Sequence, residues 1–497
     1  MPKFILRMLF LSMIVLLLSL TVMAQTPAPT QNTTNTSGAV RLNRAPVSKD
    51  VLRVHLPRPL KVTLENGLRV LIVEDHHSPM IFMTTAIVGA GEVYDPPSQP
   101  GLSEFTRNLL REGTTTRTSK QIAQEVARLG LMFGSSFGNP SEQLVAIGLS
   151  DNFDQWFDLY TDVLLHPSFP ETEVELRKQQ RLVSLKEQRT DADFLAEERI
   201  RQALYGSHPA AVASPTEASV KAMTHDALAA YYGERYVPQN AVLAIAGDVN
   251  TKDLIAKLNK AFAGWHSTNF KPTLPSDPVP QTVRKILLVN RPASVQTNIV
   301  LGNLAIRRRD PDYVPLVVMN KILGGSAAAR LFMNLREAKG YTYGAYSSVN
   351  ARAYIGTVKA SSEVRTAVTE GAMTEFFHEL DRISEQPVPV EELDKVKRSI
   401  VASFALSLES PRSVLSDWLT VEQNGFPETY WDTYVDQVMA VTPTDVQRVA
   451  RKYFDPKAIQ VVAVGDAAKI KAGLEKWGTV TVYNADGTLA SPKTANH

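Results

Sequence analysis

The sequence predicts an α+β fold made of two duplicated halves, each a mixed sheet packed with helices. Three observations support this prediction. First, residues 442–466 repeat the pattern of residues 224–248: a Thr-capped helix, an aromatic residue, a proline turn, an apolar strand and a Gly-Asp pair. Second, the two Gly-Asp pairs lie 218 residues apart (466 − 248), which is the length of a domain and not of a short repeat. Third, the segment 266–282 between the halves carries four prolines, as is typical of a semi-rigid linker.

The first half, residues 51–265, alternates between strand and helix periods. Asn66-Gly67 between two alternating apolar runs predicts a hairpin over 61–73. Further strands are expected over 80–89, over 133–150 as a pair, and over 241–248. Helices are expected over 101–114, 119–129, 152–165, from 170 through 187, 224–236 and 254–262.

The second half, residues 283–478, contains a predicted helix over 326–338 that ends before Gly340. A strand is expected to follow over 341–349, because its apolar and polar residues alternate. Residues 479–497 are expected to form a tail, with a last strand over 479–483.

The N-terminus has the pattern of a secretory signal peptide. Lys3 and Arg7 precede an apolar run, and Ala24 offers a small-residue cleavage site before Gln25. We therefore predict a cleaved signal peptide over 1–24, with an uncleaved signal anchor as the alternative. Since the run is short for a membrane span, no stable span is expected after cleavage. Residues 25–50 are rich in Thr, Asn, Pro and Gln and are expected to form a disordered tether.

Composition excludes several classes of site and partner. The chain has 497 residues, a net charge of +2 and no long basic run, which gives no support for a nucleic acid partner. It contains no cysteine, so disulfides, thiolate metal sites, a cysteine nucleophile and a lipid-modified cysteine are all excluded. A signal peptide on a chain without cysteine favours an exported protein of the bacterial periplasm.

The helix over 101–114 carries the most informative motif. Glycines bracket it, and Glu104, Arg107 and Asn108 lie along one side. The frame Gly-Leu at its start and Gly-Thr at its end resembles the insulinase/pitrilysin peptidases, the inverzincins, whose motif is G-[LI]-x-H-x-x-E-H-x-x-x-x-G-T. In this register Glu104 replaces the first zinc-binding His, Arg107 replaces the general base and Asn108 replaces the second His.

This degenerate motif is not expected to bind zinc. Such a site needs two neutral imidazoles, a carboxylate and an open position for water. Arg107 cannot act as a base, and its charge opposes a divalent cation. The segment Arg181–Glu187 resembles the R-x-V-x-x-x-E of the family, which places the third ligand position at Glu187, but one carboxylate without histidines is a weak site. His76 and His77 follow a strand beside Pro79 and are expected to be loop residues without a metal.

A second motif lies in the second half. Arg336 is placed near the end of the helix 326–338, and Tyr343 follows seven residues later at the start of a strand. The spacing resembles the L-R-x-x-x-G-x-x-Y of the family, whose Arg and Tyr hold the substrate carbonyl and stabilise the tetrahedral intermediate. A guanidinium and a phenol are suitable donors to a developing oxyanion. The structural alternative is an Arg that pairs with its own helix end and a Tyr that packs in a sheet.

The resemblance implies a division of roles between two chains. Some bacterial members, like mitochondrial processing peptidase, place zinc in one subunit and substrate-holding elements in the other. We predict that this chain is the zinc-less, substrate-holding subunit of an exported heterodimeric zinc metallopeptidase. It would carry no cofactor and be inactive alone. A homologous partner with an intact H-x-x-E-H would carry the zinc, and the two subunits would enclose a peptide chamber.

Two alternatives remain open from the sequence. The first is a non-catalytic peptide-binding or scaffold protein of the same fold, which would capture extended peptides at a sheet edge by strand addition. The second is an enzyme active alone through Glu104 and Glu187, which stoichiometric zinc in the purified chain would support.

Overall fold

The computed structural model describes residues 52–137 and 141–490. The predicted signal peptide over 1–24 and the tether over 25–50 lie outside the described residues. Within the described part of the chain, no helix is both long and apolar enough to cross a membrane.

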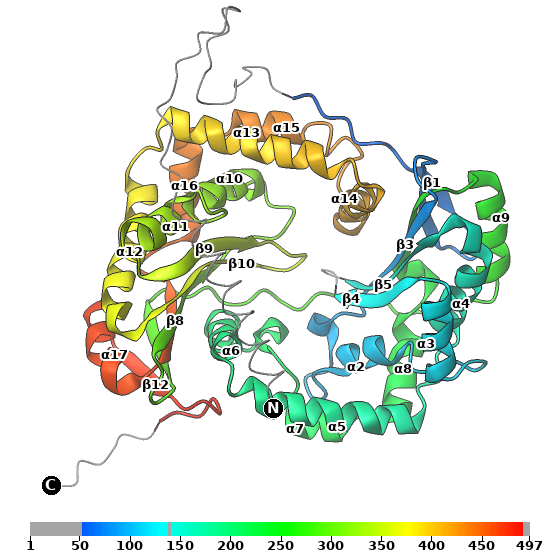
Figure 1. Ribbon diagram of the computed structural model, residues 1–497, viewed down its shortest axis with the longest axis horizontal. Coiled ribbons are helices and arrows are strands. Elements are labelled where there is room, and N and C mark those ends of the chain that lie inside the picture. The colour runs from blue at the N-terminus through cyan, green and yellow to red at the C-terminus, as the bar shows by residue number, and fades with distance from the viewer. Residues whose placement is uncertain (1–51, 138–140, 491–497) are drawn as a thin grey trace, which may run out of the picture. The chain divides into compact units, whose positions relative to one another are not determined.

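The first half is a six-stranded mixed sheet with helices (Figure 1). Its strand order is β1-β2-β6-β3-β5-β4, and only the β2–β6 pair is parallel. The strands are β1 (Leu60–Thr63), β2 (Arg69–Glu74), β3 (Met80–Val88), β4 (Met132–Phe137), β5 (Ser141–Leu149) and β6 (Ala241–Gly247). The helices are α2 (Leu102–Leu109), α3 (Ser119–Arg128), α4 (Phe153–Leu165), α5 (Glu171–Gln188), α6 (Ala192–Tyr205), α7 (Glu217–Lys221), α8 (His225–Arg235) and α9 (Thr251–Phe262).

The second half has a six-stranded sheet with the order β12-β7-β11-β8-β10-β9, in which β7 pairs in parallel with both β11 and β12. The strands are β7 (Lys285–Asn290), β8 (Gln296–Leu304), β9 (Thr342–Asn350), β10 (Thr357–Arg365), β11 (Gln460–Gly465) and β12 (Val480–Tyr483). The helices are α10 (Tyr313–Leu323), α11 (Arg330–Phe332), the π-helix η5 (Met333–Ala338), α12 (Thr369–Glu385), α13 (Val390–Ser407), α14 (Pro411–Asn424), α15 (Tyr434–Ala440), α16 (Pro443–Tyr453) and α17 (Ala467–Leu474). Short 3-10 turns are η1 (Glu92–Tyr94), η2 (Ser150–Asn152), η3 (Pro209–Ala211), η4 (Pro238–Asn240), η6 (Thr366–Val368) and η7 (Glu475–Trp477).

The duplication is confirmed at the level of single elements. Helices α5 and α13 each have 18 residues, follow a proline, and begin 219 residues apart (390 − 171). Helices α6 and α14 each have 14 residues and begin 219 residues apart (411 − 192). The predicted α+β fold with two duplicated halves of mixed sheet is therefore correct, and the segment 266–282 between them holds neither helix nor strand. A chamber closed by a partner stays a prediction.

Each sheet has two apolar faces, because successive side chains along a strand point to opposite sides. In β6, Leu243 and Ile245 join the core beneath the helices of the first half, whereas Val242 and Ala244 point the other way. This second face is covered by α14 of the second half, which packs on β6, β2 and β3.

The second sheet is completed in the same manner by the first half. Helix α6 packs on β8 and β11, where Leu195 and Ile200 meet Val300 and Val462. The two halves thus exchange equivalent helices, and each apolar sheet face is covered only when both halves are folded.

The predicted helix over 326–338 differs from the observed structure. Residues 326–329 form a turn, and the helical part begins at Arg330 in α11 and continues as the π-helix η5, which ends at Ala338. An α-helix and a π-helix both place apolar residues three to five positions apart on one side. The apolar periodicity of the sequence therefore does not distinguish them.

Candidate functional site

Helix α2 presents the degenerate zinc motif. Leu102, Phe105 and Leu109 are buried, which turns Glu104 and Arg107 to the other side of the helix. Gly101 precedes the helix with φ +92°, and a Cβ there would lie 2.7 Å from Pro215, so only glycine fits this start without strain.

The N-terminus of α2 is capped by a carboxylate that the sequence analysis did not identify. Asp95 accepts the backbone N–H of Gly101 at 2.7 Å and that of Ser103 at 2.9 Å. Burial raises the pKa of Asp95 to about 6, although these hydrogen bonds favour its charged form. The helix that carries the motif is therefore held at its start by a carboxyl group that gains a proton near pH 6.

Arg107, at the position of the general base, is held in an ion pair. Its Nη1 lies 3.2 and 3.1 Å from the two carboxylate oxygens of Glu142 on β5. Glu142 is only 2% exposed, and burial raises its pKa while the charge on Arg107 opposes this rise. The guanidinium of Arg107 is paired with Glu142 and is therefore not free to act on a substrate.

Glu104, at the first ligand position, is also paired. Arg181 on α5 approaches its carboxylate with Nε at 3.0 Å and Nη2 at 3.2 Å. The same guanidinium donates to the hydroxyls of Ser184 at 3.3 Å and Ser214 at 3.0 Å. A second fixed positive charge thus lies where the family would bind a cation.

The remaining two positions of the motif do not complete a metal site. Asn108 is half-buried on α2, and Glu187 is exposed on α5, where Arg181 and not Glu187 contacts Glu104. Over residues 52–137 and 141–490 no three His, Asp or Glu side chains are grouped so as to hold a metal ion. The donor set present, a paired carboxylate and an amide beside two arginines, does not fit zinc.

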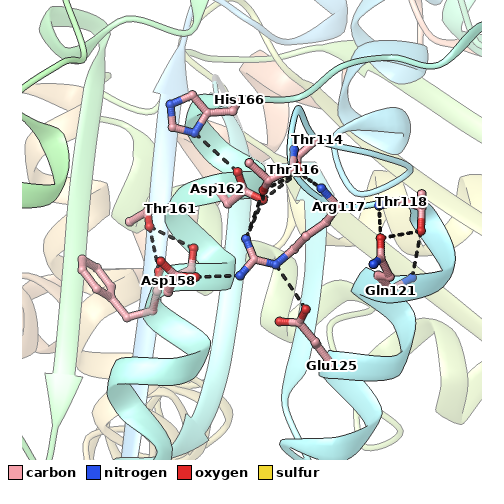
Figure 2. A network of polar contacts seen from close by, with 11 residues as sticks. Thr114, Thr116, Arg117, Thr118, Gln121, Glu125, Asp158, Thr161, Asp162 and His166 are labelled. Atoms are coloured by element: carbon pink, nitrogen blue, oxygen red, sulfur yellow. Dashed lines mark hydrogen bonds and ion pairs between the residues drawn. The ribbon is translucent and has the colours of Figure 1, made fainter.

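The loop after α2 is fixed by a polar network centred on Arg117 (Figure 2). Its guanidinium bonds to Asp162 at 2.8 Å, to Asp158 at 2.6 Å and to Glu125 at 3.2 Å. The largely buried Asp162 also accepts the hydroxyls of Thr114, at 2.6 Å, and Thr116. This network joins the loop after α2 to α3 and α4 and fixes the Gly-Thr end of the motif frame.

Arg336 and Tyr343 come from consecutive elements of the second half. Arg336 lies in η5 with its side chain 47% exposed, and its Nε is 3.6 Å from Glu337, which is a loose contact. Tyr343 lies on β9 with 91% of its surface exposed. Strand β9 is the end strand of its sheet, and both side chains are open to solvent.

His76 and His77 follow β2, as expected for loop residues. His76 lies between Asp248 (2.6 Å) and Glu74 (3.0 Å), so both ring nitrogens donate when the imidazole is protonated. These hydrogen bonds, led by the one to Asp248, raise the pKa of His76. The arrangement joins the ends of β2 and β6 on the surface, away from the motif.

The sequence did not identify the ion-pair partners, Glu142 for Arg107 and Arg181 for Glu104. They lie 35 and 77 residues from their arginine and glutamate along the chain. One signal was available: a half-buried Arg107 on an amphipathic helix requires a carboxylate partner. Sequence spacing could not tell which carboxylate supplies it.

Comparisons with known proteins agree with this architecture. The family model described as Insulinase (Peptidase family M16) matches residues 70–215, and that described as Peptidase M16 inactive domain matches residues 222–400. An uncharacterized zinc protease of Bacillus subtilis, YmxG, is 24% identical over 79% of this chain and 95% of its own length. An uncharacterized zinc protease of Mycobacterium tuberculosis is 26% identical over 79% of this chain and 90% of its own length.

Solved structures show the same fold. A crystal structure of a peptidase M16 inactive domain from Pseudomonas fluorescens has a TM-score of 0.76 and 25% identity, over 82% of this chain and 98% of that one. A protease from Helicobacter pylori has a TM-score of 0.75 over 82% of this chain and all of its own length, and at 21% identity this likeness shows the fold alone. Together with the frame of α2 and the duplicated halves, these matches show that the chain belongs to the insulinase/pitrilysin family of peptidases, family M16.

Proposed function

We propose that this chain is the zinc-less, substrate-holding subunit of an exported two-subunit zinc metallopeptidase that acts on peptides. The proposal rests on a contrast between the residues of the zinc motif and the Arg336/Tyr343 pair. The motif side of the chain has lost its ligands and base, and Glu104 and Arg107 are engaged by Arg181 and Glu142. On the other side, Arg336 and Tyr343 keep the family spacing and stay exposed.

The contribution of this chain would be to bind and polarise the scissile carbonyl. A guanidinium and a phenol are hydrogen-bond donors, so Arg336 and Tyr343 would donate to the same carbonyl oxygen. Donors aimed at a developing oxyanion stabilise the transition state more than the ground state. The hydrolytic water and the zinc would come from a homologous partner subunit with an intact H-x-x-E-H helix.

Export is part of the proposal and rests on the N-terminal residues. The basic pair, the apolar run and Ala24 form a signal-peptide pattern, and the chain has no cysteine. Fractionation of cells that produce the tagged full-length chain, with its N-terminus sequenced, tests this part. Recovery with the cytoplasmic fraction and an intact Met1 would contradict it.

The function is tested by reconstitution. The chain alone, a candidate H-x-x-E-H partner alone, and their mixture are assayed for peptide hydrolysis, zinc content and mass in solution. We expect a one-to-one complex that holds zinc and cleaves peptides, while this chain alone does neither. Cleavage by the partner alone at the rate of the mixture would show that this chain has no role in turnover.

A peptide-binding scaffold is the second candidate, and the end strands favour it. Strands β4 and β9 occupy equivalent ends of the two described sheets, and each pairs on one side only. An extended peptide can add to such an edge by backbone hydrogen bonds. Peptide binding without any complex or turnover after mixing would support this candidate over the subunit.

A further inference from the structure

The turn that carries Arg336 has an uncommon backbone geometry. In η5, residues Met333–Ala338, the N–H of Lys339 bonds to the carbonyl of Asn334, five residues back, at 3.0 Å. Such π-turns hold one residue more than an α-helical turn and are frequent at functional sites. The extra residue changes the direction in which Arg336 leaves the helix.

Arg336 lies on an aromatic ring. Its guanidinium carbon is 4.7 Å from the ring centre of Phe332, which is 4% exposed. A cation over an aromatic face is attracted by the negative charge of that face. Because Phe332 is buried, it restricts the Arg336 side chain, whose ion pair with Glu337 at 3.6 Å is loose.

The strand that carries Tyr343 reaches the same ring. Tyr346 on β9 contacts Phe332 with ring centres 5.6 Å apart. Its own ring folds back over Gly344, where an added Cβ would lie 2.7 Å from Tyr346. Gly344 is the neighbour of Tyr343, so one continuous set of contacts leads from the strand position of Tyr343 to the guanidinium of Arg336.

We propose that Phe332 and Tyr346, here called the aromatic bracket, are positioning residues that fix Arg336 relative to Tyr343. This inference rests on the proposed function, in which the two donors act on one carbonyl oxygen. The π-turn directs Arg336 toward the bracket, and Gly344 leaves the space that Tyr346 needs. The physical reason is that two donors stabilise one oxyanion only when both lie within hydrogen-bond distance of it at the same time.

The first test is made on the reconstituted enzyme. Phe332→Leu should lower kcat/KM about 10-fold, while Phe332→Tyr, which keeps an aromatic face, should stay within about 2-fold of the parent. A double-mutant cycle gives the decisive comparison. In the Arg336→Ala background, Phe332→Leu should have no further effect, since the guanidinium that it positions is absent.

Two further variants test the aromatic bracket without changing Phe332. Gly344→Ala displaces the Tyr346 ring without removing a core side chain, and deletion of Glu337 converts the π-turn into an α-helical turn. Both should lower kcat/KM while the melting temperature and zinc content of the complex stay unchanged. They keep the inference testable if Phe332→Leu fails to fold.

A measurement on the chain alone separates this inference from the proposed function. In the free chain, the Arg336 Nε–Hε signal, identified by its loss in Arg336→Lys, should show the upfield shift of a proton above an aromatic ring. Phe332→Leu should remove that shift. An unshifted signal, or additive losses in the double-mutant cycle, would overturn the aromatic bracket, whereas a full rate with Arg336→Ala would overturn the proposed function instead.

Discussion

At the scale of single residues, substitution of either proposed oxyanion donor should slow catalysis. Arg336→Ala or Tyr343→Phe should slow turnover of the assembled enzyme by about 10²-fold, the size of one lost oxyanion donor. Steady-state rates with equal amounts of complex measure this effect. Arg128→Ala, which changes an exposed arginine of α3, is the matched control and should leave the rate unchanged. Normal rates in both site variants, with the complex intact, would show that neither side chain touches the substrate.

Asp95 gives the chain a pH-dependent stability. Its pKa is about 6 in the folded chain and near 3.8 when unfolded, because burial disfavours the charge. Between these values the folded state binds the extra proton, so the free energy of unfolding falls as pH rises from about 4 to 6. Asp95→Asn should remove up to about 3 kcal/mol of this pH dependence, as urea titrations at pH 4 and pH 7 would show. Asp226→Asn, at an exposed site, should retain the full difference.

At the scale of elements, Arg117 connects α2 to two neighbouring helices. Arg117→Ala leaves the largely buried Asp162 without its cation and should cost about 3 kcal/mol of unfolding free energy. Lys221→Ala, which breaks an exposed pair with Glu217 within α7, should cost under about 1 kcal/mol. Denaturant midpoints compare the two, and equal small losses would mean that the Thr114 and Thr116 hydroxyls hold Asp162 without Arg117.

The sequence predicted the helices and strands better than the ion pairs between them. The Gly-Asp repeats identified the duplication, and the Gly-Thr frame identified α2, because these signals lie within short stretches of chain. The Glu104–Arg181 and Arg107–Glu142 pairs were missed, since an ion pair across two elements leaves no period in either one. The roles of Arg336 and Tyr343 stay predictions, although the structure places both at the surface. The π-turn was missed because its apolar residues also suit an α-helix.

At the scale of the whole molecule, exchange of α6 and α14 ties the halves together. A protease site inserted after the exposed Val279 should give two fragments that still elute as one species, because each sheet keeps the helix of the other half. Size-exclusion chromatography under native conditions measures this. Leu415→Asp on α14 puts a charge into the shared core and should let the cut fragments separate. Separation of the cut parent chain without that substitution would refute the structural role of the exchange.

Helix α14 also determines when the first sheet can be fully covered during synthesis of the chain. The last strand of the first sheet ends at Gly247, but the helix that covers its second face ends at Asn424, 177 residues later (424 − 247). At about 5–20 residues per second, the ribosome needs roughly 10–35 s to supply it. During that interval Leu71, Val242 and Ala244 present an uncovered apolar surface. We therefore expect a chaperone to bind the nascent chain during this interval. Truncation anywhere before α14 should yield a fragment that aggregates and not a smaller folded protein.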